Sequence, residues 1–218
     1  MRSNSILAVI WDLDGVIIDS GEEHRKAWQR LAQETGVPFT DEQFWATFGK
    51  RNDAIIPPIW GSLSAERVSE LADRKEAYFR EFVRETIAPL PGAIELLSAL
   101  HDAGYAQALA SSTPVENIQL INEVLGLDRY LSVFVSGEMV PHGKPAPDVF
   151  LKAAEELGIE PARCLVIEDA VAGVEAAHAG GMRCIAVAGH RDLPGLRQAE
   201  LMVKDLTEVA VEKIRHLA

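Results

Sequence analysis

The sequence has few cysteines and no apolar run long enough to cross a membrane. Its two cysteines, Cys164 and Cys184, each lie inside a short apolar segment, which predicts buried, reduced thiols rather than a disulfide or a metal pair. The apolar segment from Ile6 to Trp11 is far shorter than the roughly 20 residues of a membrane-spanning helix. No small-residue cleavage site follows it, so we expect a cytoplasmic protein without a membrane partner.

Basic side chains are also scarce. The 21 lysines and arginines stand against 33 aspartates and glutamates, which gives a net charge of −12. Such a chain repels nucleic acid and anionic membranes, so we expect neither as a partner. We find no internal repeat, low-complexity run or glycine-serine linker. The 218 residues, 48% of them hydrophobic, suit one globular domain or one domain with an insertion, and we expect a monomer.

From Pro89 onward, short β-branched runs alternate with helical periodicity, a pattern typical of βα units and a parallel sheet. The expected strands are 7–11, 106–110, 133–136, 164–167, 184–187 and, as a weaker edge strand, 201–203. Their continuous apolar character predicts burial on both faces. Between them we expect helices, including one at 91–104 and one capped by Thr113, with Pro114 in its first turn and Gly126 at its end.

Residues 20–86 contain no convincing strand. Three amphipathic helices are expected there, at 22–36, 40–49 and 64–86. Thr40 and Ser64 are the predicted caps of the second and third. The predicted fold class is α/β, a Rossmann-like parallel sheet core of residues 1–19 and 87–218 with an inserted all-helical cap domain of residues 20–86. The insertion would lie over the carboxyl ends of the strands, where ligands bind in such folds.

Two carboxylates, Asp12 and Asp14, end the first buried strand, and Gly15 permits the turn that presents them. Carboxylates this close repel each other unless a cation lies between them or one of them is protonated. Mg²⁺ accepts oxygen ligands of this kind. Taken alone, the pair is equally compatible with a turn or a helix cap.

Polar residues also follow later strands. Ser111 or Ser112 ends the second strand and precedes a helix, where a hydroxyl and free amides can bind phosphate, although serine is also a common cap. Lys144 precedes a proline, which favours an extended backbone, although a loop lysine is usually only solvated. Glu168 and Asp169 end another buried strand, and a buried acidic pair requires a cation. Together these features predict a phosphoryl-transfer site with a carboxylate nucleophile, a metal and fixed donors.

The ordered motifs DxDGV, a serine after a strand, GKPAPD, and ED after a strand resemble those of the haloacid dehalogenase superfamily over essentially the whole chain. The resemblance implies that Asp12 is the nucleophile that forms an aspartyl-phosphate and that Asp14 is the general acid and base. Ser111 would bind the transferring phosphoryl group, and Lys144 would balance its charge. The implied ligands of Mg²⁺ are Asp12, the backbone carbonyl of Asp14, Asp169, and Glu168 directly or through water. Members that dehalogenate lack an acid at the position of Asp14, whose presence therefore favours phosphoryl transfer.

Within the superfamily, the stretch DLDGVIIDSGEEHRKAW is most similar to β-phosphoglucomutase, whose branch also contains sugar-phosphate phosphatases and a pyrophosphatase. His24 matches a histidine that couples cap closure to the general acid, and Lys75 matches a cap lysine. The mutase loop that grips a distal phosphate corresponds to Gly49, Lys50 and Arg51, at a shorter glycine-to-arginine spacing. The residues implied in substrate binding are His24, Gly49, Lys50, Arg51, Lys75 and Ser112. The alternative for His24 is a helix-face residue, and for the three basic residues solvated surface charges.

We therefore expect a Mg²⁺-dependent phosphatase of a small phosphorylated metabolite, because hydrolysis is the commoner activity in the superfamily and demands less of the cap. β-Phosphoglucomutase is the alternative. It differs only in the second half-reaction, where Asp14 activates a sugar hydroxyl instead of water. A phospho-accepting receiver module has similar residues around its aspartate, but it is much shorter, lacks a helical insertion, and places the aspartate after a middle strand.

Overall fold

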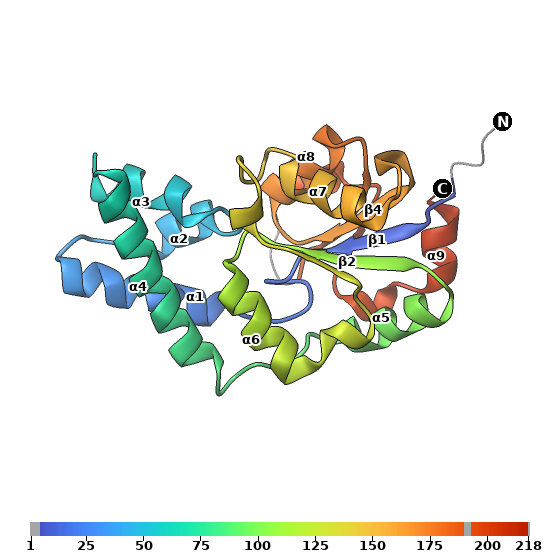
Figure 1. Ribbon diagram of the computed structural model, residues 1–218, viewed down its shortest axis with the longest axis horizontal. Helices are drawn as coiled ribbons and strands as arrows, with labels where there is room; N and C mark the ends of the chain where they lie inside the picture. The colour runs from blue at the N-terminus through green and yellow to red at the C-terminus, as the bar shows by residue number, and fades with distance from the viewer. Residues whose placement is uncertain (1–4, 190–192, 218) are drawn as a thin grey trace.

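The structure, a computed structural model, describes residues 5–189 and 193–217. Its centre is a parallel six-stranded sheet of order β3-β2-β1-β4-β5-β6, flanked by helices (Figure 1). The strands are β1 (Ala8–Trp11), β2 (Ala106–Ala110), β3 (Val133–Val135), β4 (Cys164–Glu168), β5 (Arg183–Val187) and β6 (Leu201–Val203). Every predicted strand is confirmed to within one residue at each end, and β6 is an edge strand.

The sheet is buried on both faces. Along β1, Val9 and Trp11 enter one apolar layer while Ala8 and Ile10 enter the other, because successive side chains of a strand point to opposite faces. The first layer is covered by α5 (Ala93–Asp102), α6 (Val115–Leu125) and α9 (Val211–His216), and the second by α7 (Asp148–Leu157) and α8 (Val171–Ala179) (Figure 1). The apolar runs of the sequence follow from this double cover.

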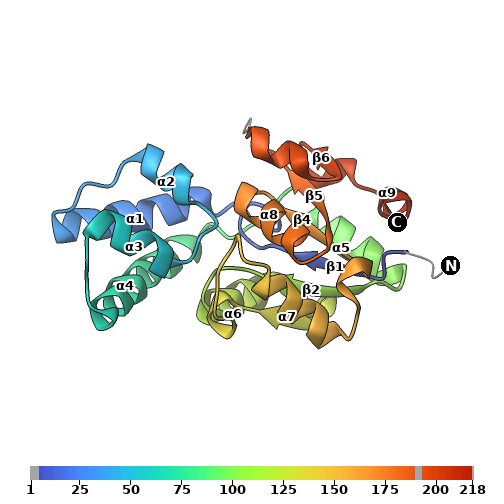
Figure 2. The ribbon, with the colours of Figure 1, turned by 90° about the horizontal axis from the view of Figure 1, so that it is seen from above.

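Between β1 and α5 the chain forms four helices: α1 (Gly21–Thr35), α2 (Asp41–Thr47), α3 (Asn52–Trp60) and α4 (Ala65–Val83). We call residues 21–83 the helical segment. It has an apolar core of its own that includes Trp28, Phe44 and Leu71. Figures 1 and 2 show it at one end of the molecule, beyond the carboxyl ends of the strands. The predicted fold class, a Rossmann-like sheet with an inserted helical part, is therefore confirmed.

The helix ends follow the sequence in most places. The side chains of Thr40 and Ser64 cap α2 and α4, and Gly126 ends α6 in the left-handed conformation, as predicted. The prediction of Thr113 as the cap of α6 is wrong. Pro114 is extended (ψ 155°) and takes the cap position, so the helix begins one residue later, and the hydroxyl of Thr113 instead accepts a hydrogen bond from a side chain of the first turn.

The sequence did not predict α3, whose segment NDAIIPPIW contains Pro57 and Pro58. Proline inside a helix removes a backbone hydrogen bond and clashes with the preceding turn. Here the helix has only nine residues, and Ile55 and Ile56 are buried in the core of the helical segment. Burial of these two side chains favours the helix where local propensity does not.

The chain leaves the sheet and returns to it through two connections that touch each other. Ile18 and Pro89 form an antiparallel bridge, and the N–H of Leu90 donates to the carbonyl of Ile17 at 2.8 Å. The two covalent connections between the helical segment and the sheet thus lie side by side. Among the described residues, no helix combines the length and the apolar character that crossing a membrane requires.

Cys164 in β4 and Cys184 in β5 are free thiols and buried. Burial raises the pKa of Cys164 to about 11 and that of Cys184 well above its usual value. The thiolate is the reactive form. We expect neither thiol of the native protein to react with a small disulfide reagent at about pH 8, and both to react after denaturation. Rapid reaction of a native thiol would instead show that these strands open locally.

Candidate active site

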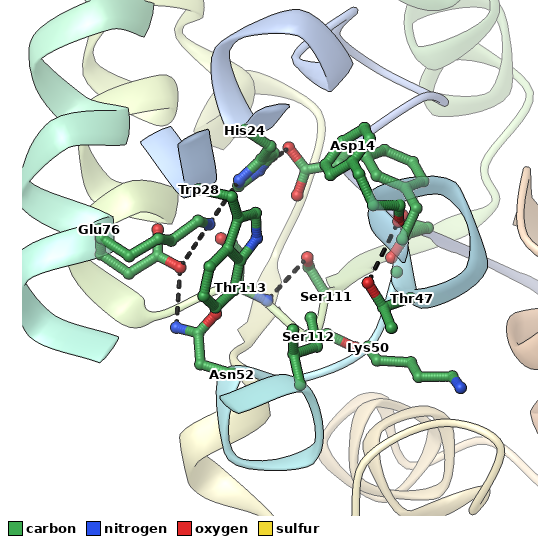
Figure 3. Close-up of a pocket in the computed structure, with 16 residues that line it drawn as sticks. Asp14, His24, Trp28, Thr47, Lys50, Asn52, Glu76, Ser111, Ser112 and Thr113 are labelled. Carbon is green, nitrogen blue, oxygen red and sulfur yellow. Dashed lines mark hydrogen bonds and ion pairs between the residues drawn. The ribbon is translucent and has the colours of Figure 1, made fainter. Parts of the chain in front are cut away.

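The candidate site lies at the carboxyl edge of the sheet, where β1 pairs with β2 on one side and with β4 on the other. The strand order reverses at this point, and ligands of open α/β folds bind beyond the strand ends at such a reversal. A cavity there is closed by the helical segment (Figure 3). Its lining includes Asp12, Asp14, Ser111 and Ser112 from the sheet side and His24, Gly49, Lys50 and Lys75 from the helical segment.

Asp12 follows β1 directly, and its N–H continues the ladder to Ile167 of β4 at 2.9 Å. The side chain is 6% exposed, and its Oδ1 accepts a hydrogen bond from Lys144 Nζ at 2.5 Å. Burial raises the pKa of Asp12 well above its usual value; Lys144 opposes this rise, while the nearby carboxylates Glu168 and Asp169 add to it. The positive charge of Lys144 therefore does not fully compensate for the burial of Asp12 and the negative charges of the neighbouring carboxylates.

Asp12, Glu168 and Asp169 form a buried acidic cluster in which each offers a carboxylate oxygen within 4.8 Å of the others. Three carboxylates beside the single ammonium of Lys144 are unfavourable in a buried position unless another cation joins them. Oxygen ligands at this spacing suit a hard divalent cation such as Mg²⁺. The residues present therefore fit the expected metal. The carboxylate of Asp14 is not part of this cluster.

The two acids after β4 differ in their contacts. Glu168 Oε1 accepts a hydrogen bond from Lys144 Nζ at 2.7 Å, and its Oε2 accepts the backbone N–H groups of Asp169 and Ala170, both at 2.6 Å. A carboxylate has about four acceptor positions. The protein already uses three of those of Glu168, so few remain for a metal.

Two glycines allow these carboxylates to approach the backbone. A Cβ on Gly15, whose φ is 83°, would lie 1.9 Å from Asp169 Oδ2. A Cβ on Gly173 would lie 1.8 Å from Glu168 Oε1. Any side chain at either position would displace a carboxylate of the acidic cluster. The glycine of the DxDGV motif is thus required for the contact with Asp169 as well as for the turn.

Asp14 lies beside the buried cluster and contacts the helical segment. Its Oδ1 accepts a hydrogen bond from Ser20 Oγ at 2.5 Å and lies 3.3 Å from His24 Nε2. Burial raises the pKa of Asp14, but His24 and the hydrogen bonds from His24 and Ser20 outweigh it and lower the pKa. The other ring nitrogen of His24, Nδ1, lies 2.7 Å from Lys75 Nζ. A chain of polar contacts therefore joins Asp14 to α1 and α4.

Ser111 follows β2 and is 2% exposed. Its N–H donates to the carbonyl of Val135 at 3.0 Å, and its Oγ accepts the N–H of Thr113 at 3.2 Å. The loop therefore holds the hydroxyl toward the cavity that contains Asp12 (Figure 3). Ser112 lines the same cavity, next to the N-terminal end of α6.

In the loop before α3, the two predicted basic residues Lys50 and Arg51 have different surroundings. Lys50 lines the cavity with its side chain directed away from Glu76 (Figure 3). Arg51 does not line it: Nη1 donates to the carbonyls of Gly137 and Val140 at 3.0 and 2.9 Å, and Nη2 pairs with Asp53 at 2.7 Å. In this arrangement Arg51 joins the helical segment to the loop after β3, and it lies outside the cavity that contains Asp12.

Glu76 is a cavity residue that sequence reasoning missed. It is 4% exposed. Oε1 accepts hydrogen bonds from Lys75 Nζ at 2.8 Å and Asn52 Nδ2 at 2.9 Å, and Oε2 accepts one from Asn117 Nδ2 at 2.7 Å. A signal was available, because Glu76 lies three residues before the buried Phe79 on α4 and so falls on the apolar face of that helix.

Comparison with known proteins gives consistent matches. Residues 6–181 match the family model of haloacid dehalogenase-like hydrolases. Hexitol phosphatase A of Escherichia coli is 33% identical over 204 residues, 94% of this chain and 93% of that protein. β-Phosphoglucomutase of Bacillus subtilis is 32% identical over 213 residues, 94% and 92% of the two chains. The crystal structure of β-phosphoglucomutase from Clostridium difficile has a TM-score of 0.86 at 27% identity, and covers 97% of this chain and 96% of its own.

Proposed function

Because this chain belongs to the haloacid dehalogenase-like hydrolases and is an enzyme, we propose that it hydrolyses a small phosphate monoester, such as a sugar phosphate, with Mg²⁺ as cofactor. The observation that carries the proposal is the buried contact of Asp12 with Lys144 beside Glu168 and Asp169, at the carboxyl edge of the sheet. The hexitol phosphatase among its relatives supports a phosphorylated sugar or polyol as the substrate class.

In this proposal Asp12 attacks the phosphorus atom and forms an aspartyl-phosphate, while Asp14 gives a proton to the departing alcohol oxygen. Asp14 then takes a proton from a water molecule, which attacks the same phosphorus and releases inorganic phosphate and Asp12. Lys144 offsets the negative charge of the phosphoryl oxygens, and the hydroxyl of Ser111 binds the phosphoryl group. Mg²⁺ held by Asp12, Asp169, Glu168 and the backbone carbonyl of Asp14 would supply the positive charge that the phosphate and the acidic cluster need.

We extend the proposal to the domain organisation, with residues 20–86 as a cap over a core of residues 1–19 and 87–218, of which 1–4, 190–192 and 218 lie outside the described residues. The cavity that contains Asp12 has a volume of about 50 Å³, which is room for only a few water molecules. The closed helical segment thus leaves little room for a sugar phosphate beside Asp12, and we expect the segment to move away from the sheet when substrate enters.

β-Phosphoglucomutase activity is the second candidate. The contacts of His24 with Asp14 and Lys75, at 3.3 and 2.7 Å, favour it because they connect the expected general acid to the closed helical segment. A mutase would use this closure to exclude water, and Asp14 would take its proton from a sugar hydroxyl.

Assay of a panel of sugar phosphates and pyrophosphate with Mg²⁺ tests the proposal. We expect inorganic phosphate from at least one monoester, and none after chelation of the metal. Incubation of β-glucose 1-phosphate with glucose 1,6-bisphosphate tests the alternative, since glucose 6-phosphate formed without free phosphate would identify a mutase. A long-lived acyl-phosphate without turnover would contradict both enzymatic functions and indicate a phospho-accepting module.

A further inference from the structure

A second, larger cavity adjoins the one that contains Asp12. Its volume is about 750 Å³, and it lies between α3, α4 and the loops that follow β2 and β3. Asn52, Glu76 and Ser112 line both cavities. These three residues therefore form the boundary between the cavity that contains Asp12 and this larger space.

The second cavity is acidic. Its described lining contains the carboxylates of Asp53, Asp73, Glu76, Glu116 and Glu138. The lining also contains two guanidinium groups: Arg51 pairs with Asp53 at 2.7 Å, and Arg80 donates to the neutral Asn117 Oδ1 at 2.9 Å. The five carboxylates therefore still outnumber these two cations. An anionic leaving group would therefore enter a region of unfavourable potential.

Glu76 is the carboxylate closest to the reaction, because it alone of these five also lines the cavity of Asp12. Burial raises the pKa of Glu76, but Lys75 and His24 lower it by a larger amount. The pKa of Glu76 is therefore below its usual value. The charge of Lys75 is in turn offset by Glu76 at 2.8 Å. Lys75 is therefore not an uncompensated cation that a second phosphate could bind.

Glu76 also retains the capacity to bind a hydroxyl. Its three donors are Lys75, Asn52 and Asn117, whereas a carboxylate offers about four acceptor positions. A hydroxyl of the leaving group can occupy the fourth position. The same oxygen atoms would repel a phosphate group placed there, because both are anionic and the site is buried.

We propose that Glu76 is a specificity-determining residue, and that the enzyme acts on monophosphate esters of uncharged polyhydroxylated compounds and discriminates against bisphosphates. The proposal rests on the proposed phosphatase function and deepens it. The hydroxyl-bearing end of the substrate lies beside Glu76 and extends toward the acidic cavity. The region between the two cavities thus selects the leaving group by charge, while Asp12 and Lys144 bind the phosphate that is removed.

The test compares fructose 1-phosphate with fructose 1,6-bisphosphate, which differ only in the phosphate that would lie near Glu76. Calorimetric titration of the Asp12→Asn protein with each compound, in the presence of Mg²⁺, measures binding without turnover. We expect the monophosphate to bind at least about tenfold more tightly. Adding Glu76→Gln, which keeps the size of the side chain and removes its charge, should narrow this ratio to near unity.

Two further variants separate charge from structure. Glu76→Asp keeps the charge and should retain most of the discrimination. Glu81→Gln, on the exposed face of α4 where Glu81 pairs with Arg30, should leave the ratio unchanged. Thermal unfolding of each variant shows that it is folded.

Equal binding of the two compounds, or a ratio that Glu76→Gln does not alter, would overturn the assignment of Glu76. These outcomes differ from failure of the proposed phosphatase function, in which the wild-type enzyme would release phosphate from no monoester, including small aryl phosphates. Because the titration uses a protein that does not turn over, it gives a result in either case.

Discussion

Asp12→Asn should reduce the release of inorganic phosphate by about 10⁴-fold or more, as removal of a covalent nucleophile does in other enzymes. An amide cannot form the aspartyl-phosphate, and no other carboxylate contacts Lys144 from the end of β1. We expect the protein to remain folded. Asparagine removes a carboxylate that is unfavourable in this position, because burial and the neighbouring carboxylates raise the pKa of Asp12. Lys144 keeps its contact with Glu168 at 2.7 Å.

Phosphate release with saturating substrate and Mg²⁺ measures this effect, and thermal unfolding checks the fold. Acid-quenched wild-type enzyme should carry the mass of one phosphoryl group, and the variant should not. Asp19→Asn is the matched control, because Asp19 is an exposed acid of the same loop. Turnover in Asp12→Asn near the wild-type rate would refute covalent catalysis by Asp12, and an equal loss in Asp19→Asn would indicate a general disturbance of the loop.

Asp169→Asn should raise the Mg²⁺ concentration for half-maximal activity by about 10² or more, the upper range seen when residues at a metal site are replaced. Glu168→Gln should have a much smaller effect. Three acceptor positions of Glu168 are already used by Lys144 and two backbone amides. The carboxylate of Asp169 lies against Gly15 and belongs to the acidic cluster.

Two measurements are informative here. The first is the activity of each variant across a range of Mg²⁺ concentrations. The second is thermal stability, because a metal that binds only the folded state raises the unfolding temperature by mass action. We expect Mg²⁺ to stabilise the wild type and Glu168→Gln but not Asp169→Asn. Equal effects of the two substitutions would show that the ligand assignment is wrong.

The strands of the sheet could be predicted closely because their continuous apolar character indicates burial on both faces. Strands such as 106–110 and 164–167 are short, mostly apolar runs, and a doubly covered parallel sheet buries both of their faces. The predictions failed where local preference and packing disagree. Pro57 and Pro58 oppose α3, yet Ile55 and Ile56 are buried in the helical segment, and one extended residue, Pro114, moves the start of α6 beyond Thr113.

The candidate site divides in a similar way. Asp12, Asp14, Ser111 and the acidic pair after β4 could be foreseen together, because parallel strands deliver their carboxyl ends to one edge. The position of Arg51 could not, since its partners are the carbonyls of Gly137 and Val140, more than 80 residues away. The periodicity of α4 could place Glu76 on the buried face of that helix, but its contacts with Asn52 and Asn117 depend on the approach of α3 and α6 to α4.

The bridge between Ile18 and Pro89 has a consequence for motion. The two connections are also joined by the hydrogen bond from the N–H of Leu90 to the carbonyl of Ile17, at 2.8 Å. Because they are fixed to each other, they can act as a single pivot. We expect a helical segment that opens around such a pivot to rotate rather than to slide along the sheet edge. Closure would then return His24 to the same position beside Asp14, so the backbone connections would contribute to the accuracy of closure before substrate binds.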